Sequence, residues 1–311
     1  MKFEWRSYVR PFVKPLRTTH GEWRDRSGIL LKLTSADGRV GYGEIAPVPW
    51  FGSETLQQAI AWCQHMPQPV NQAAIAAIPD ALPACQFGLE SAWEGFTNPA
   101  APPAMPLSAL LPTGAAALSA WEPLWQAGYR TFKWKIGVAA LAQELTWFAA
   151  LHSALPPDCH LRLDANGGLT PDQAAHWLEV GDHMGLEYLE QPLPPTQFHE
   201  MVALQSAFTT AIALDESVAT LSQLRHCLEH GWRGVVIIKP AIAGSPAKLR
   251  QFCAKHSLDL VFSSVFETAI GRQAGLRLAA ELGNRDRAMG YGTTQWFHPD
   301  TQNFDALWQH L

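Results

Sequence analysis

The feature that most constrains the fold is a pattern that recurs between residues 129 and 240. Short runs of strand-forming residues alternate with helix-forming stretches, and each run carries a charge near its carboxyl end. The charged residues are Lys133, Lys135, Asp164, Glu190, Asp215 and Lys239. From Lys135 onward they are separated by 29, 26, 25 and 24 residues, about the length of one strand–helix unit. The pattern predicts a parallel sheet with crossover helices.

Further segments extend the pattern to eight strands. Residues 105–111 are the expected first strand, and residues 258–264 and 288–292 are the expected last two. Thr170-Pro171 and Ser245-Pro246 each offer an N-cap followed by proline, so we expect helices to begin there. Eight parallel strands with helices between them predict a barrel over residues 105–292.

Alternation along each strand decides which side chains meet. Side chains two positions apart point to one face, so Lys133 and Lys135 share a face and Phe132 and Trp134 share the other. We expect the apolar set to face the helices and the charged set to converge at the mouth of the barrel. Burying charges together costs on the order of several kcal/mol per unpaired ion, which a purely structural protein would avoid.

The charged set suits metal-assisted removal of a proton next to a carboxylate. The carboxylates of Asp164, Glu190 and Asp215 supply the hard oxygen ligands that Mg²⁺ prefers. A lysine inside the barrel can act as the base, because burial and nearby positive charge lower its pKa. Lys135 lies nearer the carboxyl end of its strand and is our candidate base. Lys133 would depress the pKa of Lys135 and contact the substrate carboxylate.

Residues 1–104 have a different pattern. Runs at residues 8–12, 27–33 and 40–45 alternate like antiparallel strands, with Asp37-Gly38 as the turn between the last two. Residues 54–62 and 85–96 are expected helices, and the proline-rich stretch 98–103 marks a boundary. We expect an α+β module ahead of the barrel, against which a tail at residues 293–311 returns and packs.

One segment of this module matches a nucleotide-binding fingerprint. Gly41-Tyr-Gly43-Glu-Ile-Ala46 fits the pattern G-x-G-x-x-A. Pro47 and Pro49 follow, so the required helix cannot continue, and we reject a nucleotide site. Residues 17–21 and 47–53 are expected loops, which are either ordinary turns or cover the barrel mouth and shape a substrate pocket.

Charge and composition exclude several classes of partner. The formal net charge is −5 and there is no run of Lys and Arg, so neither nucleic acid nor an anionic membrane is expected to bind. No apolar run reaches the roughly 18 residues of a membrane span. Five widely spaced cysteines without a C-x-x-C motif are typical of reduced thiols in a cytoplasmic protein. A small-molecule carboxylate is the expected partner, and monomer and homo-oligomer both stay open.

Five short motifs together resemble the enolase superfamily, in its muconate-lactonizing-enzyme-like subgroup. They are Lys133-x-Lys135, Asp164-x-Asn166, Glu190-Gln191-Pro192, Asp215-Glu216-Ser217 and Ile238-Lys239-Pro240. The resemblance implies a modified TIM barrel, (β/α)₇β, with an α+β capping domain formed from the N-terminal region and the C-terminal tail. This agrees with a capping domain over residues 1–104 and 293–311 and a barrel over residues 105–292.

Within that subgroup, residues 41–55, 161–166 and 262–268 are most similar to the o-succinylbenzoate synthase family. The resemblance implies a Mg²⁺-dependent hydro-lyase of menaquinone or phylloquinone biosynthesis, with Mn²⁺ as a substitute metal. Its reaction is the syn elimination of water from 2-succinyl-6-hydroxy-2,4-cyclohexadiene-1-carboxylate through an enediolate. Lys135 would remove the proton and return it to the leaving hydroxyl, and Lys239 would act as a cation over the dienyl ring.

Substrate contacts are expected from Arg162, Ser263 and Gly290. For Arg162, a buried ion pair with a neighbouring carboxylate is an equal alternative. Asn166 and Gln191 would orient the metal ligands. Residues 50–52, Trp-Phe-Gly, depart from the Gly-Phe-Ser that is usual in relatives and add bulk to that loop.

The same residues are also compatible with two other functions, a racemase or epimerase and a non-catalytic binding protein. An N-succinylamino acid racemase, or a related epimerase of the same superfamily, would use Lys135 and Lys239 as bases on opposite faces of the substrate. Dipeptide epimerases typically carry Asp-x-Asp at the eighth strand, where this chain has no acid between Met289 and Thr293, so that reaction is disfavoured. A non-catalytic binding protein that retains the barrel is also disfavoured, because every charged position of the pattern is filled.

Overall fold

The barrel predicted from the charged pattern is confirmed. The structure, a computed structural model, describes residues 1–18, 21–97, 100–298 and 303–309. Its parallel strands are β4 (Leu107–Leu110), β5 (Thr131–Lys135), β6 (His160–Asp164), β7 (Tyr188–Glu190), β8 (Ala211–Leu214), β9 (Val235–Ile238), β10 (Asp259–Phe262) and β11 (Met289–Gly292). They form one sheet in the order β10-β9-β8-β7-β6-β5-β4-β11. A single parallel bridge between Ser263 and Gly290 joins its two edges and nearly closes the barrel.

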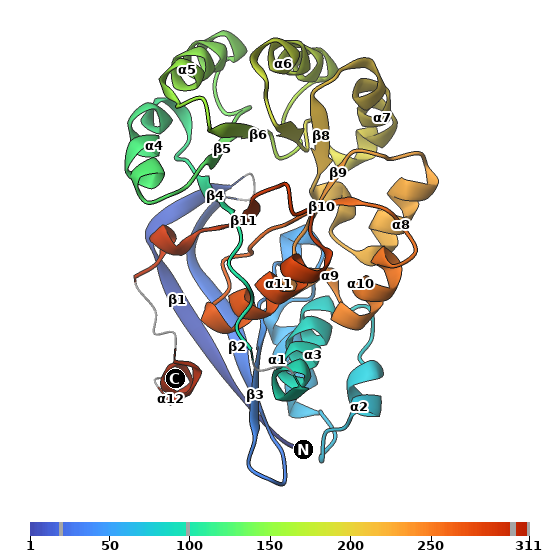
Figure 1. Ribbon diagram of the computed structural model, residues 1–311. Helices are drawn as coiled ribbons and strands as arrows, with labels where there is room; N and C mark the ends of the chain where they lie inside the picture. Colours follow the sequence, from blue (N-terminus) through green and yellow to red (C-terminus); the bar gives the residue numbers. More distant parts are fainter. Residues whose placement is uncertain (19–20, 98–99, 299–302, 310–311) are drawn as a thin grey trace.

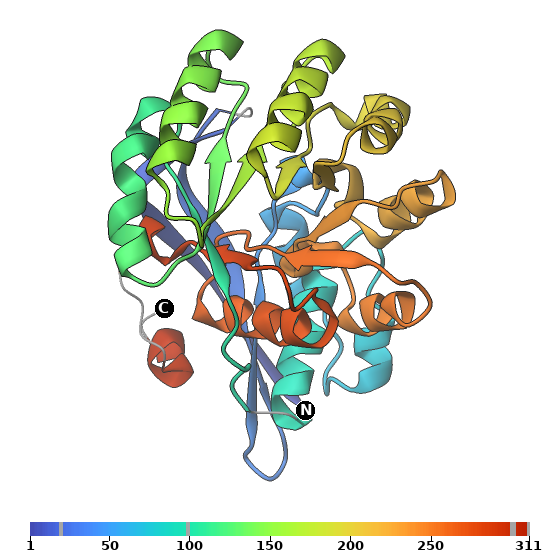
Figure 2. The same ribbon diagram turned by 45° about the horizontal axis from the view of Figure 1, so that its top comes forward.

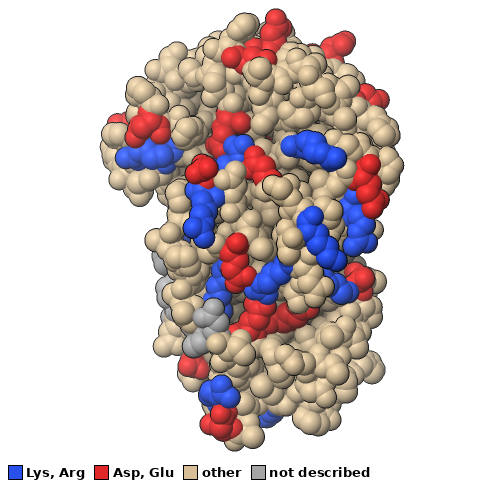
Figure 3. Space-filling model, turned by 45° about the vertical axis from the view of Figure 1, so that its right-hand side comes forward, with Lys and Arg blue, Asp and Glu red and all other residues tan. Residues whose placement is uncertain are grey.

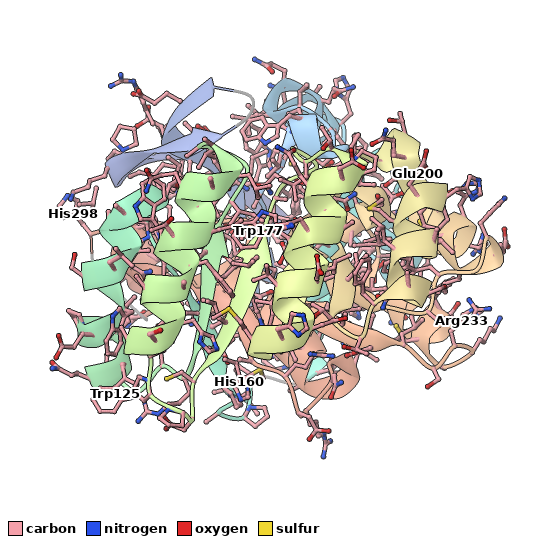
Figure 4. All side chains as sticks on the ribbon, turned by 90° about the horizontal axis from the view of Figure 1, so that it is seen from above. Trp125, His160, Trp177, Glu200, Arg233 and His298 are labelled. Carbon is pink, nitrogen blue, oxygen red and sulfur yellow. The ribbon has the colours of Figure 1, made fainter. Side chains whose placement is uncertain are left out.

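Helices cover the outside of the strands (Figures 1 and 2). They are α4 (Ala117–Gln126), α5 (Leu141–Ala154), α6 (Pro171–Met184), α7 (Phe198–Ala207), α8 (Leu221–Glu229), α9 (Pro240–Ala243), α10 (Pro246–Cys253) and α11 (Ala269–Leu282), with 3₁₀ turns at Gly114–Ala116, Pro195–Gln197 and Glu216–Val218. Trp177 lies between α5 and α6 (Figure 4), where its ring meets the edge of Phe148 with 5.5 Å between centroids. The apolar face of each strand is thus buried against the helices.

The expected helix starts are confirmed at both sites. Thr170 accepts a hydrogen bond from the backbone N–H of Gln173, with proline at the first position of α6. Ser245 caps α10 in the same way, again ahead of a proline. The caps begin the helices where the chain leaves a barrel strand, which keeps the connections short.

A three-stranded antiparallel sheet precedes the barrel, as predicted, but two of its strands are longer than expected. It consists of β1 (Lys2–Thr18), β2 (Gly21–Thr34) and β3 (Val40–Ile45), followed by the 3₁₀ turn Pro49–Phe51 and by α1 (Leu56–Gln64), α2 (Gln72–Ala76) and α3 (Pro83–Thr97). The expected loop at residues 17–21 was wrong at Arg17, Thr18 and Gly21, which pair in the ladder of β1 and β2. Residues 19–20 of that loop lie outside the described residues.

The glycines of the G-x-G-x-x-A segment have a packing role. A Cβ on Gly41 would lie 2.0 Å from the carbonyl oxygen of Ala92, and one on Gly43 would lie 2.0 Å from that of Gly88. Both carbonyls belong to α3, so the glycines let the helix pack directly on β3. This close approach accounts for the glycine pattern without a nucleotide.

The tail after the barrel returns to the N-terminal module. It contains a 3₁₀ turn at Thr294–Trp296 and the helix α12 (Phe304–Gln309), which lies beside β1 (Figure 1). Trp308 packs with Tyr8, Leu30 and Ile270, and the carbonyl oxygen of Trp308 accepts a hydrogen bond from Arg6 at 2.6 Å. The tail therefore bridges capping module and barrel, whereas the proposed boundaries at residues 104 and 292 stay predictions.

Acidic and basic side chains are interspersed on the surface. On the face in Figure 3, Lys and Arg lie among Asp and Glu and much of the surface is uncharged. No helix in the described part of the chain is both long and apolar enough to cross a membrane. All five cysteines are free thiols, as expected.

Candidate active site

A cavity of about 230 Å³ opens at the carboxyl ends of the barrel strands. Every member of the charged set lines it: Lys133, Lys135, Asp164, Glu190, Asp215 and Lys239. The alternate residues Phe132 and Trp134 are buried on the opposite face of β5. The structure therefore brings together side chains that lie more than 100 positions apart in the sequence.

Lys133 lies between two carboxylates. Its Nζ donates to Oδ2 of Asp164 at 2.7 Å and to Oε1 of Glu190 at 2.8 Å. Burial alone would lower the pKa of Lys133, but the attraction of the two carboxylates outweighs it and raises the pKa well above its usual range. Lys133 is therefore a permanent cation two residues from Lys135.

Lys239 follows β9 on the other side of the barrel. Its Nζ donates to Oδ1 of Asp215. The same ammonium lies 4.0 Å from the centroid of the Phe51 ring. This is a cation–π geometry, and it agrees with the predicted role of Lys239 as a cation over a dienyl ring, which stays a prediction.

Lys135 differs from the other two lysines. It is half-buried and lines the cavity, yet within the described residues no hydrogen bond or ion pair engages its ammonium group. An amine that no carboxylate holds can approach a substrate. This contrast supports Lys135 as the candidate base among the three.

The carboxylates differ in their affinity for protons. Burial raises the pKa of Glu190 to about 8, and the charge of Asp164 adds to the effect. Burial also raises the pKa of Asp215, to about 6, against the attraction of Lys239. For Asp164, the attraction of Lys133 outweighs burial and lowers the pKa. When all three carboxyls are ionised, the site therefore holds more negative charge than its two bound ammonium groups stabilise.

These carboxylates fit a divalent cation by their chemistry. In the described ranges, no three His, Cys, Asp or Glu side chains form a ready-made metal site. Instead, the ammonium groups of Lys133 and Lys239 lie on the carboxylate oxygens. Carboxylate oxygens are the ligands that Mg²⁺ prefers, and positive groups already contact all three side chains. The metal site stays a prediction.

Asn166 and Gln191 support the carboxylates from behind. The backbone N–H of Asn166 donates to Oδ1 of Asp164 at 3.1 Å. The Oε1 atom of Gln191 accepts from the backbone N–H groups of Asp215, at 2.9 Å, and Ser217, at 3.1 Å. Both Asn166 and Gln191 have positive φ, 43° and 37°, so the chain turns sharply just after each strand. Their expected role in orienting ligands agrees with these contacts.

Arg162 forms the buried ion pair that was the alternative to a substrate contact. Its Nε and Nη2 donate to Glu187 at 2.7 and 2.8 Å, and its Nη1 donates to the carbonyl oxygen of Ala288 at 2.8 Å. Glu187 and Ala288 precede their strands, so the guanidinium points to the amino end of the barrel. Arg162 therefore forms part of the cavity floor with its three nitrogens engaged, which weakens its predicted role as a substrate contact.

Ser263 and Gly290 meet where the two edges of the barrel join. The hydroxyl of Ser263 lies 3.4 Å from the carbonyl oxygen of Gly290. A Cβ at position 290 would lie 2.6 Å from that hydroxyl oxygen and 3.0 Å from the Cβ of Ser263, so a side chain there would force Ser263 to shift. Both residues line the cavity, as expected of substrate contacts.

Glu216 is a site residue that the strand pattern did not reveal. It lines the cavity and accepts a hydrogen bond from Nδ2 of Asn166 at 3.1 Å. Alternation would turn Glu216 away from the face of Asp215, but β8 ends at Leu214 and Asp215 has φ −121° and ψ −76°. The second acid in Asp215-Glu216 was the available signal.

Aromatic side chains roof the cavity. The aromatic roof consists of Trp23, Trp50 and Phe266, which line the cavity, and of Phe12 and Phe297, which pack with Phe266 and with each other outside the lining. Ring centroids are 4.7 Å apart between Phe12 and Phe297, 5.0 Å between Trp23 and Trp50, and 5.7 Å between Trp23 and Phe266. Because Trp50 lines the cavity from the 47–53 segment, that segment covers the barrel mouth, as one of its two expected roles requires.

Comparisons with known proteins agree with this site. Residues 116–304 match the family described as enolase C-terminal domain-like, and residues 7–95 match the MenC N-terminal domain. The o-succinylbenzoate synthase of Thermosynechococcus vestitus is 42% identical, over 100% of this chain and 99% of the relative. The crystal structure of o-succinylbenzoate synthase from Thermosynechococcus elongatus, with Mg in the active site, has a TM-score of 0.93 and 41% identity, and each chain is covered completely.

The chain belongs to the enolase superfamily. Its barrel carries acids at the strand ends beneath an α+β cap, and the enolase C-terminal domain-like family matches most of that barrel. The N-succinyl Arg/Lys racemase of Bacillus cereus shares this fold, with a TM-score of 0.78 at 18% identity over 96% of this chain and 88% of the racemase. Within the superfamily, the chain belongs to the o-succinylbenzoate synthases. It is an enzyme of the carbon–oxygen lyase class.

Proposed function

We propose that this enzyme removes water from 2-succinyl-6-hydroxy-2,4-cyclohexadiene-1-carboxylate and releases o-succinylbenzoate, a step toward menaquinone or phylloquinone. Identity over the full length to an o-succinylbenzoate synthase supports the substrate. The observation that carries the proposal is the cavity itself, whose lining an unengaged lysine shares with two lysines held by carboxylates. Cytoplasmic location and Mn²⁺ as a substitute metal belong to the same proposal.

The proposed residues divide the chemistry among them. Asp164, Glu190 and Asp215 would hold Mg²⁺, which when bound supplies positive charge beside the substrate carboxylate. Lys135 takes the proton from the carbon next to that carboxylate, and the electron pair of the C–H bond forms the new ring double bond. As the C–O bond breaks, Lys135 returns the proton to the leaving hydroxyl, so that water departs.

The remaining residues position the substrate. Lys239 holds its positive charge over the ring face, in the place where it now meets the Phe51 ring. Ser263 and Gly290 offer the wall on the far side of the cavity. The aromatic roof covers part of the cavity, and a substrate bound beneath it would displace water and so strengthen the charge interactions there.

A spectrophotometric assay with the cyclohexadiene substrate tests the proposal. We expect turnover in Mg²⁺, its loss in excess EDTA, and its recovery on adding Mg²⁺ or Mn²⁺. Absence of turnover in Mg²⁺ by a folded protein would contradict the proposal.

A second candidate reaction is racemisation of N-succinylamino acids. The observation that favours it is the placement of Lys135 and Lys239 on strands separated by three others around the barrel. Two lysines on opposite sides of a substrate can remove and return a proton on either face. Deuterium entering Cα of N-succinyl amino acids in D₂O at turnover rates would support this reaction.

A further inference from the structure

Glu216 has a buried oxygen with an unused hydrogen-bonding capacity. Its Oε1 accepts from Nδ2 of Asn166 at 3.1 Å. Its Oε2 is shielded from solvent and has no hydrogen-bond partner within the part of the chain that the structure describes. Burying a carboxylate oxygen without a donor is costly, so a retained oxygen of this kind indicates a partner in another state of the site.

The ammonium group of Lys239 is a donor that needs a second acceptor when a metal ion binds at its present one. It is bound to Oδ1 of Asp215, one of the three proposed metal ligands. Two cations close together on one carboxylate repel each other, because like charges at short range are unfavourable. When a divalent cation takes Asp215, the ammonium of Lys239 therefore needs another acceptor.

Glu216 is the carboxylate available to it. The proposed ligands Asp164 and Glu190 both contact Lys133. Glu216 lines the same cavity as Lys239 and follows Asp215 directly in the chain. Glu216 follows β8 and Lys239 follows β9, and these two strands are neighbours in the sheet.

The other half of the Glu216 carboxylate is fixed in place. Asn166 holds Oε1, and the backbone N–H of Asn166 is itself bound to Asp164. The left-handed backbone of Asn166, with φ 43°, keeps its side chain directed across the end of β7 toward Glu216. Oε2 consequently keeps one orientation while Lys239 changes partner.

We propose that Glu216 is a positioning residue that accepts the ammonium of Lys239 when a divalent cation binds Asp215. The exchange keeps Lys239 beside the substrate ring and removes a competitor from the metal site. The proposal rests on the proposed function, because it uses the same metal site. It assigns a role to a residue that neither binds the metal nor touches the reacting atoms.

Calorimetric titration of Mg²⁺ into the full-length protein, without substrate, tests the exchange. The four proteins are wild type, Glu216→Gln, Lys239→Met and the double variant. Glutamine keeps the acceptor for Asn166 but loses the charge that holds an ammonium. We expect Glu216→Gln to weaken Mg²⁺ binding about tenfold when Lys239 is present and less than twofold in the Lys239→Met background.

The matched control is Glu229→Gln, which removes an exposed acid from α8 and should bind Mg²⁺ like wild type. Wild-type affinity in Glu216→Gln would overturn the proposal. Equal weakening in both backgrounds would overturn it too, because Glu216 would then act on the metal without Lys239. If Glu216→Gln does not fold, Glu216→Asp should show a smaller loss with the same dependence on Lys239. Failure of wild type to bind Mg²⁺ would instead contradict the proposed function.

Discussion

At the scale of single residues, the lysines divide into one free amine and two bound ammonium groups. We predict that Lys135→Ala lowers kcat by at least about 10³-fold, since a positioned general base contributes on the order of 10² to 10⁴. The dehydration assay measures this loss. Mg²⁺ should still raise the melting temperature of the variant as in wild type, because Lys135 contacts none of the proposed ligands. Turnover within tenfold of wild type would contradict the assignment.

The carboxylates predict a pH-dependent metal affinity. In the metal-free protein the pKa of Glu190 is about 8 and that of Asp215 about 6, so at pH 6 Glu190 is largely protonated and Asp215 about half protonated, and Mg²⁺ must displace these protons. Affinity should rise at least about tenfold between pH 6 and pH 8, with proton release. Titrations in buffers of different ionisation heat count those protons, and a pH-independent affinity would contradict the prediction.

The same pKa values decide whether the free energy of unfolding rises or falls with pH. A carboxyl whose folded-state pKa is raised binds more protons folded than unfolded, so the metal-free protein should lose stability as pH rises from about 4.5 to 8. Mg²⁺ should offset this loss most strongly near pH 8. Melting temperatures measured with EDTA and with Mg²⁺ across that range test both statements.

Which residues face the cavity could be predicted where strands are regular. Lys133, Asp164 and Glu190 lie within or at the end of straight strands, so alternation gave their direction. Glu216 was not predicted, because the alternation of side chains between the two faces of β8 stops at Leu214. The ion pair of Arg162 could only be left open, since its partner Glu187 lies just before a neighbouring strand whose register the sequence does not state.

At the scale of elements, the contact between β3 and α3 depends on glycine. We predict that Gly43→Ala destabilises the protein by about 1–3 kcal/mol or more, because the new Cβ would lie 2.0 Å from a backbone carbonyl of α3. Chemical denaturation measures the change. Gly95→Ala is the matched control on α3, since its Cβ would lie no closer than 3.4 Å to any atom, and it should be neutral or stabilising. Equal stability of Gly43→Ala and wild type would contradict the packing argument.

The barrel strands and the capped helices were predicted within a few residues, but the lengths of β1 and β2 were not. Much of β1 is exposed, so its outer part carries no apolar alternation to indicate a strand. The helix α2 spans Gln72–Ala76 and was missed, because five residues are too few to display a helical period. Exposure in β1 and shortness in α2 set the limit at this scale.

At the scale of the whole molecule, Glu44 joins the capping module to the barrel. Its buried carboxylate accepts from Tyr8 at 2.5 Å, from the backbone of Thr268 at 2.9 Å and from that of Gly271 at 2.9 Å. We predict that Glu44→Ala lowers the free energy of unfolding by about 3–5 kcal/mol, because it leaves several buried donors without an acceptor. Urea unfolding followed by fluorescence measures this. Glu200→Ala, which removes an exposed acid on α7 (Figure 4), should change little, and a similar effect of both variants would contradict the prediction.

The aromatic roof has a consequence for how the enzyme is made. Phe12 and Phe297 stack face to face although 285 positions separate them in the sequence. During translation, this stack cannot form until the segment around Phe297 has left the ribosome. A nascent chain that already carries every lysine and carboxylate of the charged set still lacks this stack and the strands β10 and β11, so catalytic competence should appear late in synthesis.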